Sequence, residues 1–252
     1  YRALPFGETP AFPDSFTGDC SRSPVYWPDL TPQDRSKRCR GCRQVFTEGF
    51  FHEAASDSIY SRAHENQKVG YDIEEQRMVA SRIVESVLPY ASAGAWLDVG
   101  FGNGALLFTA QEYGFIPIGT DLRVENVNAL ASLGIQAHCQ ELGSLSLGEK
   151  CAVISLADVL EHMPYPKDGL RAAHRLLGES GVLFASMPNT QSMVWRALNE
   201  SNANPYWGEI EHYHNFGRDR LYELLGESGF EPVRYGISER YRACMEVIAL
   251  RR

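Results

Sequence analysis

Short apolar runs alternate with segments of helical periodicity along most of this chain. The apolar runs predict strands at 95–99, 115–120, 135–139, 152–157 and 181–187. The segments between and after them predict helices at 104–113, 123–133, 167–177 and 218–228. This alternation predicts parallel strands joined by helices that cover both faces of one sheet.

The two ends of this region complete the predicted sheet. In residues 72–90, apolar pairs such as Ile83/Val84 and Val87/Leu88 recur at helical spacing, which indicates a helix with one buried face. Two final strands, roughly at 231–239 and 243–250, are separated by only a short turn and should pair antiparallel. The predicted fold is therefore α/β: a doubly wound, seven-stranded sheet with an antiparallel C-terminal hairpin.

The pattern changes near residue 65. Residues 1–65 are proline-rich and weakly periodic, and they contain the run Cys39-Arg40-Gly41-Cys42. We expect residues 1–65 to form an irregular N-terminal extension and residues 66–252 to form the α/β domain.

Composition narrows the class of partner. The chain has 252 residues, of which 44% are hydrophobic, and its net charge is -8. This charge argues against a substrate held through a phosphate backbone, so no nucleic acid is expected. No apolar run approaches the roughly 18 residues of a membrane span, and no membrane association is expected. Six scattered cysteines do not suggest a disulfide scaffold, so a cytoplasmic protein is the default expectation.

The most informative motif follows the strand at 95–99. It contains Asp98 and the alternating glycines Gly100, Gly102 and Gly104. Such glycines let a strand-to-helix turn bring its backbone N–H groups close to a ligand. Asp121 closes the next strand, where a carboxylate can accept hydrogen bonds from both ribose hydroxyls. Together these residues predict a nucleoside-containing cofactor.

The same glycines also satisfy a dinucleotide-binding fingerprint, with Ala105 in the third small position. Asp98 favours a cationic ligand group over a pyrophosphate, and the third glycine at 104 extends the motif to Gly-x-Gly-x-Gly. The run resembles motif I of the class I S-adenosylmethionine (SAM)-dependent methyltransferases. An NAD-dependent oxidoreductase and a SAM-binding protein without catalysis remain as alternatives.

A second constellation follows the strand at 152–157. If a helical turn starts at 158, then Asp158, Glu161 and His162 share one face. Carboxylates and an imidazole that converge on a cleft suit either proton transfer or a divalent cation. The alternative is structural: Glu161 caps a backbone turn and His162 packs with a satisfied hydrogen bond.

A third cluster covers residues 205–216 and is rich in aromatic side chains and histidine. We expect it to form a lid over the pocket, with His212 or His214 pointing inward. The alternative is a loop that Trp207 and Phe216 hold to the core. At least one of these histidines is expected to be structural.

These motifs, in this order, resemble the branch of class I methyltransferases that includes ubiquinone-pathway O-methyltransferases and sugar and natural-product methyltransferases. The resemblance covers about residues 60 to 252 and implies SAM as cofactor and a small-molecule acceptor, methylated at a hydroxyl oxygen. It also implies a set of cofactor-binding residues: Asp98, Gly100, Phe101, Gly102, Gly104, Asp121, Leu122, Glu141, Leu142 and Ala157.

The acid–histidine motif further resembles that of methyltransferases that use a divalent metal. The matching positions are Asp158, Glu161, His162 and His212, which would hold Mg²⁺ or another divalent cation. Alternatively, His162 or His212 acts as a general base beside Glu161.

The N-terminal cysteines resemble part of a zinc-binding segment of some sugar methyltransferases. Cys39 and Cys42 would supply half of a tetrahedral site, and Cys20 could be a third ligand. His52 or His64 could complete the set. The alternative is a pair of thiols without metal. Cys139, Cys151 and Cys244 are expected on strands as buried small side chains.

Overall fold

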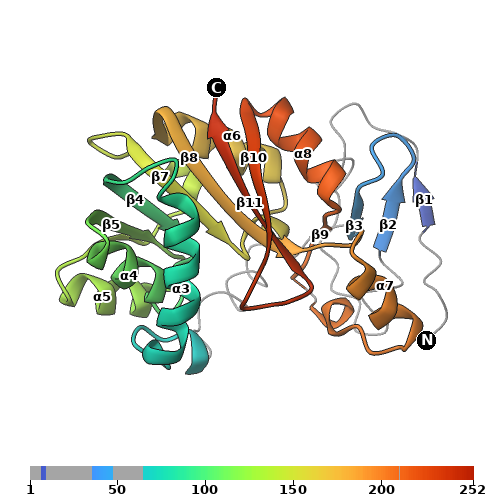
Figure 1. The fold of residues 1–252 in the computed structure, drawn as a ribbon, viewed down its shortest axis with the longest axis horizontal. Helices are drawn as coiled ribbons and strands as arrows, with labels where there is room; N and C mark the ends of the chain where they lie inside the picture. The colour runs from blue at the N-terminus through green and yellow to red at the C-terminus, as the bar shows by residue number, and fades with distance from the viewer. Residues whose placement is uncertain (1–6, 10–35, 48–64, 210) are drawn as a thin grey trace.

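The computed structural model describes residues 7–9, 36–47, 65–209 and 211–252 (Figure 1). Its centre is a seven-stranded sheet with the strand order β10-β11-β8-β7-β4-β5-β6. In chain order, these strands are β4 (Gly94–Val99), β5 (Phe115–Thr120), β6 (Gln136–His138), β7 (Cys151–Ala157), β8 (Leu177–Pro188), β10 (Phe230–Ile237) and β11 (Cys244–Arg251).

The pairing directions confirm the predicted sheet. The strands from β8 to β6 run parallel to one another, whereas β11 lies antiparallel to both β8 and β10. The carboxyl ends of β4, β5 and β7 therefore meet at one edge of the sheet. The residues that follow these strands are brought together there.

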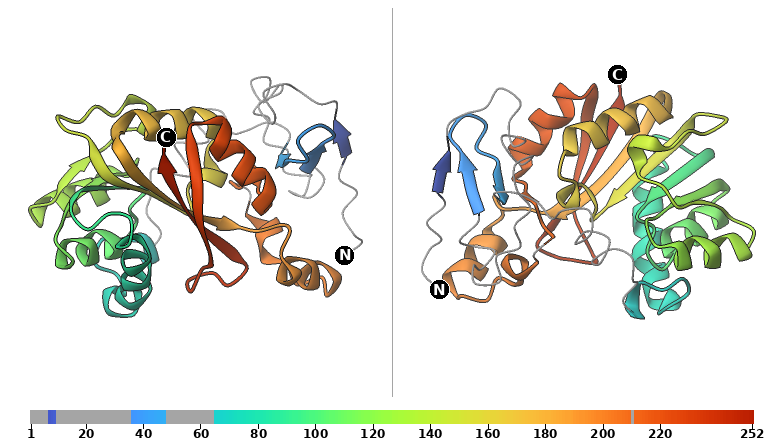
Figure 2. Two further views of the ribbon diagram at one scale, coloured as in Figure 1. Left: turned by 45° about the horizontal axis from the view of Figure 1, so that its top comes forward. Right: turned by 180° about the vertical axis from the view of Figure 1, so that it is seen from behind.

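Helices cover both faces of the sheet (Figures 1 and 2). One face packs against α3 (Ile73–Val87), α4 (Ala105–Glu112) and α5 (Val124–Ser132). The other packs against α6 (Pro166–Leu176) and α8 (Arg218–Glu227). Along β4, Trp96 and Leu97 are both fully buried and point to opposite faces, as strand alternation requires.

A second, four-stranded sheet joins the N-terminal extension to the end of the lid. It is formed by β1 (Gly7–Thr9), β2 (Ser36–Cys39), β3 (Val45–Thr47) and β9 (His214–Asn215), in that order. The pairing of β3 with β9 is antiparallel, with Val45 opposite Asn215 and Phe46 opposite His214. The described parts of the extension thus contain strands, whereas the sequence pattern indicated irregular structure.

Some elements differ from the sequence expectations. The helix α7 (Met193–Glu200) was not predicted, and β8 begins earlier than the expected strand at 181–187. Cys139 is exposed and follows the end of β6, so the expectation that it is buried in a strand was wrong, whereas Cys151 and Cys244 are buried. Short 3₁₀ turns occur at η2 (Glu65–Gln67), η3 (Leu142–Ser144), η4 (Leu160–His162) and η5 (Pro205–Gly208).

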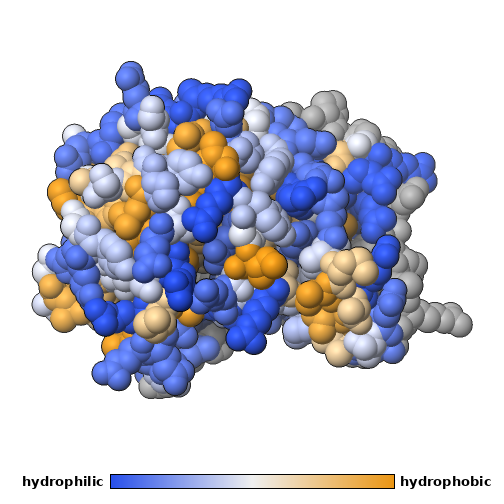
Figure 3. Space-filling model, viewed as in Figure 1, coloured by the Kyte–Doolittle hydropathy of each residue, from blue (hydrophilic) through white to orange (hydrophobic). Residues whose placement is uncertain are grey.

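The surface in the view of Figure 1 is mostly hydrophilic, with small apolar patches (Figure 3). Met193 and Val194, in the first turn of α7, are exposed apolar side chains. Across the described residues, no helix combines the length and the apolar character needed to cross a bilayer.

Candidate active site at the carboxyl edge of the sheet

The glycine turn after β4 has the backbone conformation that its sequence requires. Gly100, Gly102 and Gly104 have φ angles of 65°, 53° and 82°, which side chains with a Cβ rarely adopt. The amide of Gly100 donates a hydrogen bond of 2.7 Å to the carbonyl oxygen of Thr120, at the end of β5. This bond holds the turn beside Asp121, so the two halves of the predicted cofactor site are adjacent.

Phe101 has a packing role within this turn. Its side chain is 4% exposed and joins the core on the α3–α4 face. Gly119 on β5 provides the space, because a Cβ at that position would lie 2.6 Å from the Phe101 ring. At Phe101, therefore, only the backbone is placed to face a cofactor.

Asp98 is a buried carboxylate at the end of β4. It accepts a hydrogen bond of 2.5 Å from the hydroxyl of Ser155, which itself accepts one of 2.9 Å from the Trp96 indole. Burial raises the pKa of Asp98 to about 7, although the Ser155 bond and the positive charge of Arg240 partly oppose this shift. A cation placed at this end of the strand would favour the ionised form.

Asp121 is also buried, and its partner is Arg123. The guanidinium donates from Nε to Oδ1 over 2.8 Å and from Nη2 to Oδ2 over 2.7 Å. The carboxylate expected to bind a ribose is therefore engaged by a side chain of the protein itself.

The residues expected near an adenine differ in exposure. Leu122 and Glu141 are exposed at the ends of their segments, whereas Leu142 is 4% exposed and packs in the core on the α6–α8 face. Only the backbone of Leu142 is therefore available to a ligand. Ala157, the last residue of β7, is half-buried.

The structure brings Glu161, His162 and His212 together. One potential ligand atom from each of these side chains lies within 4.8 Å of the others. The His162 and His212 rings are 4.7 Å apart between centroids and meet edge to face. His162 Nδ1 lies 3.1 Å from the carbonyl oxygen of Glu211, a contact that places the proton on Nδ1 and leaves Nε2 with its lone pair.

Burial controls the charge of this cluster. It lowers the pKa of His162, and with the nearby His162 it lowers the pKa of His212 to about 3. Burial, together with the negative charge of Asp158, raises the pKa of Glu161 well above its ordinary value. Near neutral pH both imidazoles are thus unprotonated, the state in which a histidine can accept a proton or bind a metal.

Asp158 does not belong to this cluster. It has a φ of 56°, and the 3₁₀ turn begins later, at Leu160, so the common helical face expected for residues 158–162 is not formed. Its carboxylate accepts a hydrogen bond of 3.0 Å from Ser186 and lies 3.8 Å from the guanidinium of Arg240. Asp158 therefore influences Glu161 only through its charge.

Within the segment 205–216, some side chains pack in the core and one reaches Glu161. Trp207 and Phe216 are buried, as the structural interpretation of this segment expected. His214 is buried on β9, and its Nε2 lies 3.2 Å from the carbonyl oxygen of Pro164. Of the two inward candidates, His212 is the one that reaches Glu161.

The N-terminal extension holds His212 in place. Thr47 donates its hydroxyl to the carbonyl oxygen of His212 over 3.2 Å, and its amide donates to the carbonyl oxygen of Tyr213 over 2.8 Å. Residues of β3 thus support the lid directly.

Cys39 and Cys42 face each other across the turn between β2 and β3. Cys39 is buried and Cys42 is half-buried, and burial raises the pKa of the Cys42 thiol. The other expected zinc ligand, Cys20, lies outside the described residues, as do His52 and His64. Zinc binding here stays a prediction.

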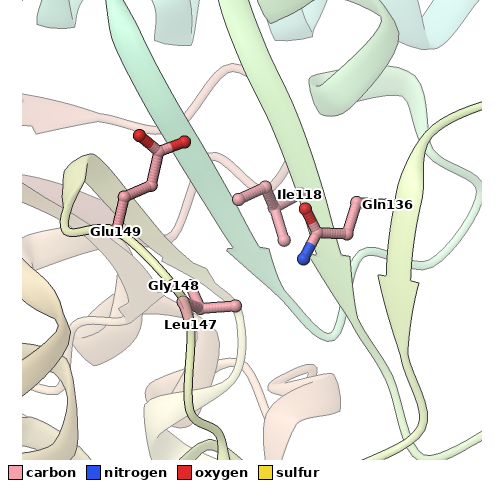
Figure 4. A pocket seen from close by; sticks show the side chains of 5 residues that line it. All are labelled: Ile118, Gln136, Leu147, Gly148 and Glu149. Carbon is pink, nitrogen blue, oxygen red and sulfur yellow. The ribbon is translucent and has the colours of Figure 1, made fainter.

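A separate hollow of about 470 Å³ lies beside β5 and β6 (Figure 4). It is lined by Ile118, Gln136, Leu147, Gly148 and Glu149. None of the predicted site residues lines it.

Comparison with known families decides the class of this fold. The sequence model of the methyltransferase domain matches residues 71–235, which is well over half of the chain. The chain belongs to the methyltransferase domain family. Together with the antiparallel β10–β11 pair, this match identifies the class I SAM-dependent methyltransferase fold and removes the dinucleotide-binding alternative.

Individual relatives of the methyltransferase domain are distant. The chain is 26% identical over 148 residues to the ubiquinone biosynthesis O-methyltransferase of Roseobacter denitrificans, and 28% identical over 149 residues to that of Ruegeria pomeroyi. Each match covers 54% of this chain and 60% of the relative. The chain thus matches about three fifths of the length of these curated relatives.

Solved structures share the fold. Magnesium protoporphyrin IX methyltransferase from Synechocystis PCC 6803, with bound SAH, superposes with a TM-score of 0.55 at 20% identity, over 71% of this chain and 84% of that one. The N-methyltransferase NodS from Bradyrhizobium japonicum WM9, in complex with S-adenosyl-L-homocysteine (SAH), superposes with a TM-score of 0.53 at 15% identity. The match covers 71% of this chain and 87% of that one.

Sequence reasoning missed three residues that bond to predicted site residues. Arg123 engages Asp121, Arg240 pairs with Asp158, and Thr47 supports His212. Only Arg123 left a local signal, because it lies two positions after the expected ribose ligand. Thr47 and Arg240 are remote in sequence from their partners.

Proposed function

We propose that this protein transfers the methyl group of SAM to a hydroxyl oxygen of a small molecule. The proposal is carried by the cluster of Glu161, His162 and His212, in which Glu161 and His212 are buried. Glu161 and His162 follow β7, at the edge of the sheet where the glycine turn also lies. The names of the curated relatives, which are O-methyltransferases, favour oxygen as the accepting atom. The net charge of -8 favours a small acceptor over a nucleic acid.

The donor would lie across the glycine turn. Asp98 would meet the ammonium group of the methionine moiety, and Asp121 would accept hydrogen bonds from the ribose hydroxyls; both side chains are buried. Gly100, Phe101, Gly102 and Gly104 would contribute their backbone. Leu122 and residues 141–142 would border the adenine, and Ala157 the methionine end.

The chemistry at the acceptor is proton removal. A sulfonium already activates its methyl group, so the protein must align the acceptor oxygen with the methyl carbon and sulfur. As the O–CH₃ bond forms, the S–CH₃ bond breaks and its electron pair stays on sulfur, giving SAH. The hydroxyl proton passes to an unprotonated imidazole, either at His162 Nε2 or on His212.

The same three residues fit a divalent cation. Both Glu161 oxygens and His212 Nδ1 are buried without a hydrogen-bond partner among the described residues, which a metal ion would satisfy. Glu161, His162 and His212 would hold the ion, which when bound supplies positive charge that favours the ionised acceptor hydroxyl. Asp158 could join them only by leaving Ser186 and Arg240.

The two predicted parts of the chain would both contribute to methyl transfer. We assign residues 66–252 to the methyltransferase domain and residues 1–65 to an extension whose strand β3 supports the acceptor side. The contact of Thr47 with His212 supports this division of roles.

The test uses SAM labelled in its methyl group and a panel of phenols, catechols and sugars, each with a matched amine analogue. We expect SAH release and label on oxygen with at least one hydroxyl acceptor. Calorimetry should show SAH binding, weakened by about 1.5–3 kcal/mol in Asp121→Ala because charge-assisted hydrogen bonds are lost. No binding of SAM or SAH, or label found only on amines, would contradict the proposal.

A further inference from the structure

The carboxylate of Asp121 has little capacity left for a ligand. Arg123 donates to Oδ1 from Nε and from its backbone amide, over 2.8 and 2.9 Å, and to Oδ2 from Nη2 over 2.7 Å. The two side chains are 2% and 14% exposed. A planar guanidinium bound in this way matches the fork of a carboxylate, as the two adjacent hydroxyls of a ribose would.

Arg123 also occupies a position at which other residues are preferred. It is the N-cap of α5 and makes no side-chain capping bond there. Serine, threonine, aspartate and asparagine are favoured at this position because their side chains accept a hydrogen bond from the first turn. The Arg123 side chain bonds to Asp121 instead of capping the helix.

The same guanidinium connects to the segment before α3, residues 65–71, which we call the strap. Arg123 Nη1 donates to the side-chain oxygen of Gln67. Asn126 Nδ2 donates to the backbone oxygen of Gln67 over 2.9 Å and to that of Gly102, in the glycine turn, over 3.2 Å. Arg123 and Asn126 thus hold the strap against the predicted cofactor site.

A second pair of bonds fixes the far end of the strap. The amide of Gly70 donates to the carbonyl oxygen of Asn103 over 3.0 Å, and Asn103 Nδ2 donates to that of Tyr71 over 2.9 Å. Asn103 lies between the glycines of the turn. The strap, the glycine turn and the start of α5 therefore form one hydrogen-bonded unit around Asp121.

We propose that Arg123 is a positioning residue that competes with the ribose of SAM for the carboxylate of Asp121. This inference rests on the proposed function, because it requires Asp121 to be the ribose ligand. The guanidinium donates to both oxygens of this buried carboxylate, in addition to the bond from the Arg123 backbone amide. A ribose that donates two hydrogen bonds to Asp121 displaces Arg123 from at least one oxygen. The affinity for SAM is then set by competition between ribose and guanidinium, and Gln67 strengthens the competitor.

The test is titration calorimetry with SAH on the full chain. Arg123→Ala removes the competitor, so SAH should bind about three- to tenfold more tightly than in the wild type. Gln67→Ala, which leaves Asp121 and its guanidinium partner intact, should tighten binding by a smaller factor. Because both variants act through one interaction, the double variant should match Arg123→Ala alone.

The matched control is Arg77→Ala. Arg77 forms a similar fork with Glu112, between α3 and α4, on the exposed surface. Its removal should leave SAH affinity within twofold of the wild type. Thermal unfolding of each variant, with and without SAH, checks that the fold is retained.

The outcomes separate this inference from the proposed function. If the wild type binds SAH and Arg123→Ala binds it equally or more weakly, the competition is overturned while the cofactor assignment holds. Tighter binding by Arg77→Ala to the same extent would also overturn it. If neither the wild type nor Arg123→Ala binds SAH, the proposed function and the inference both fail.

Discussion

The hydroxyl of Thr47 donates a hydrogen bond of 3.2 Å to the backbone carbonyl oxygen of His212, across 165 positions of sequence. This contact joins the N-terminal extension to the cluster that we propose for proton removal. Under the proposed function, this contact would let the extension position a residue of the acceptor side.

Thr47→Val removes this bond while keeping the shape of the side chain. We expect a loss of about 1 kcal/mol in the free energy of unfolding and a lower rate of methyl transfer, because His212 is less well held. SAH affinity should not change, and Thr47→Ser should restore the rate. Ser86→Ala, which loses a buried bond of 2.7 Å to Ile83 on α3, is the control for stability alone. Equal rates in Thr47→Val and the wild type would contradict the role of Thr47.

Asp98 predicts a pH dependence of cofactor binding. Burial raises its pKa to about 7. In the proposed site, only the ionised carboxylate would attract the ammonium group of SAH. The proton and the ligand therefore compete below this value, and SAH should bind about tenfold more weakly at pH 6 than at pH 8. Calorimetry at the two pH values measures the ratio. Asp98→Asn should bind weakly at both, and an equally steep dependence in that variant would exclude Asp98 as its source.

The same group affects stability with a definite sign. The folded-state pKa of Asp98 lies above the unfolded value of about 3.9, so the folded protein holds the proton more tightly. The contribution of Asp98 to the free energy of unfolding should therefore fall as pH rises from about 4 to about 7 and stay constant above. Urea unfolding of the wild type and Asp98→Asn across this range isolates the contribution. If the difference between them does not vary with pH, the raised pKa is contradicted.

Chelation distinguishes the two mechanisms proposed for Glu161, His162 and His212. If the cluster holds a divalent cation, EDTA should abolish transfer while SAH binding persists, and Mg²⁺ or Mn²⁺ should restore it. If a histidine acts as general base without metal, EDTA should have no effect. Glu161→Gln should weaken metal binding strongly in the first case, measured by Mn²⁺ paramagnetic resonance. Undiminished Mn²⁺ binding in this variant would exclude Glu161 as a ligand.

If Cys39 and Cys42 bind zinc, the purified full chain should contain about one equivalent of the metal. Elemental analysis should show the metal, and Cys42→Ser should lose it together with thermal stability. Cys151→Ser, at a buried cysteine on β7, is a control that should keep the zinc. If the wild-type protein contains no metal and Cys42→Ser does not change the melting temperature, zinc binding is contradicted. The two cysteines are then thiols without metal.

The parts of the fold that the sequence predicted are those encoded locally. The strands β4, β5 and β7 are apolar runs with clear ends, and the positive φ angles of Gly100, Gly102 and Gly104 follow from a turn that needs glycine. The side chains of Glu161 and His162 follow β7 directly, so the topology alone places them at the carboxyl edge.

The remaining features depend on contacts between distant segments. A strand as short as β9 leaves no periodic signal, and it exists because β3 supplies its hydrogen bonds. Asp158 departs from the expected helical face because its backbone has a positive φ and its side chain finds Ser186. The engagement of Asp121 by Arg123 could not be predicted, because the same pattern of residues is compatible with a free carboxylate.

The most direct test of the account is transfer of labelled methyl from SAM to a hydroxyl acceptor found in the panel, compared between the wild type and the double variant His162→Ala, His212→Ala. We expect the double variant to lose about 10²–10⁴ in rate, because general-base assistance is removed, while its SAH affinity stays within twofold of the wild type. Transfer by the double variant at the wild-type rate would contradict it and remove the cluster from the mechanism.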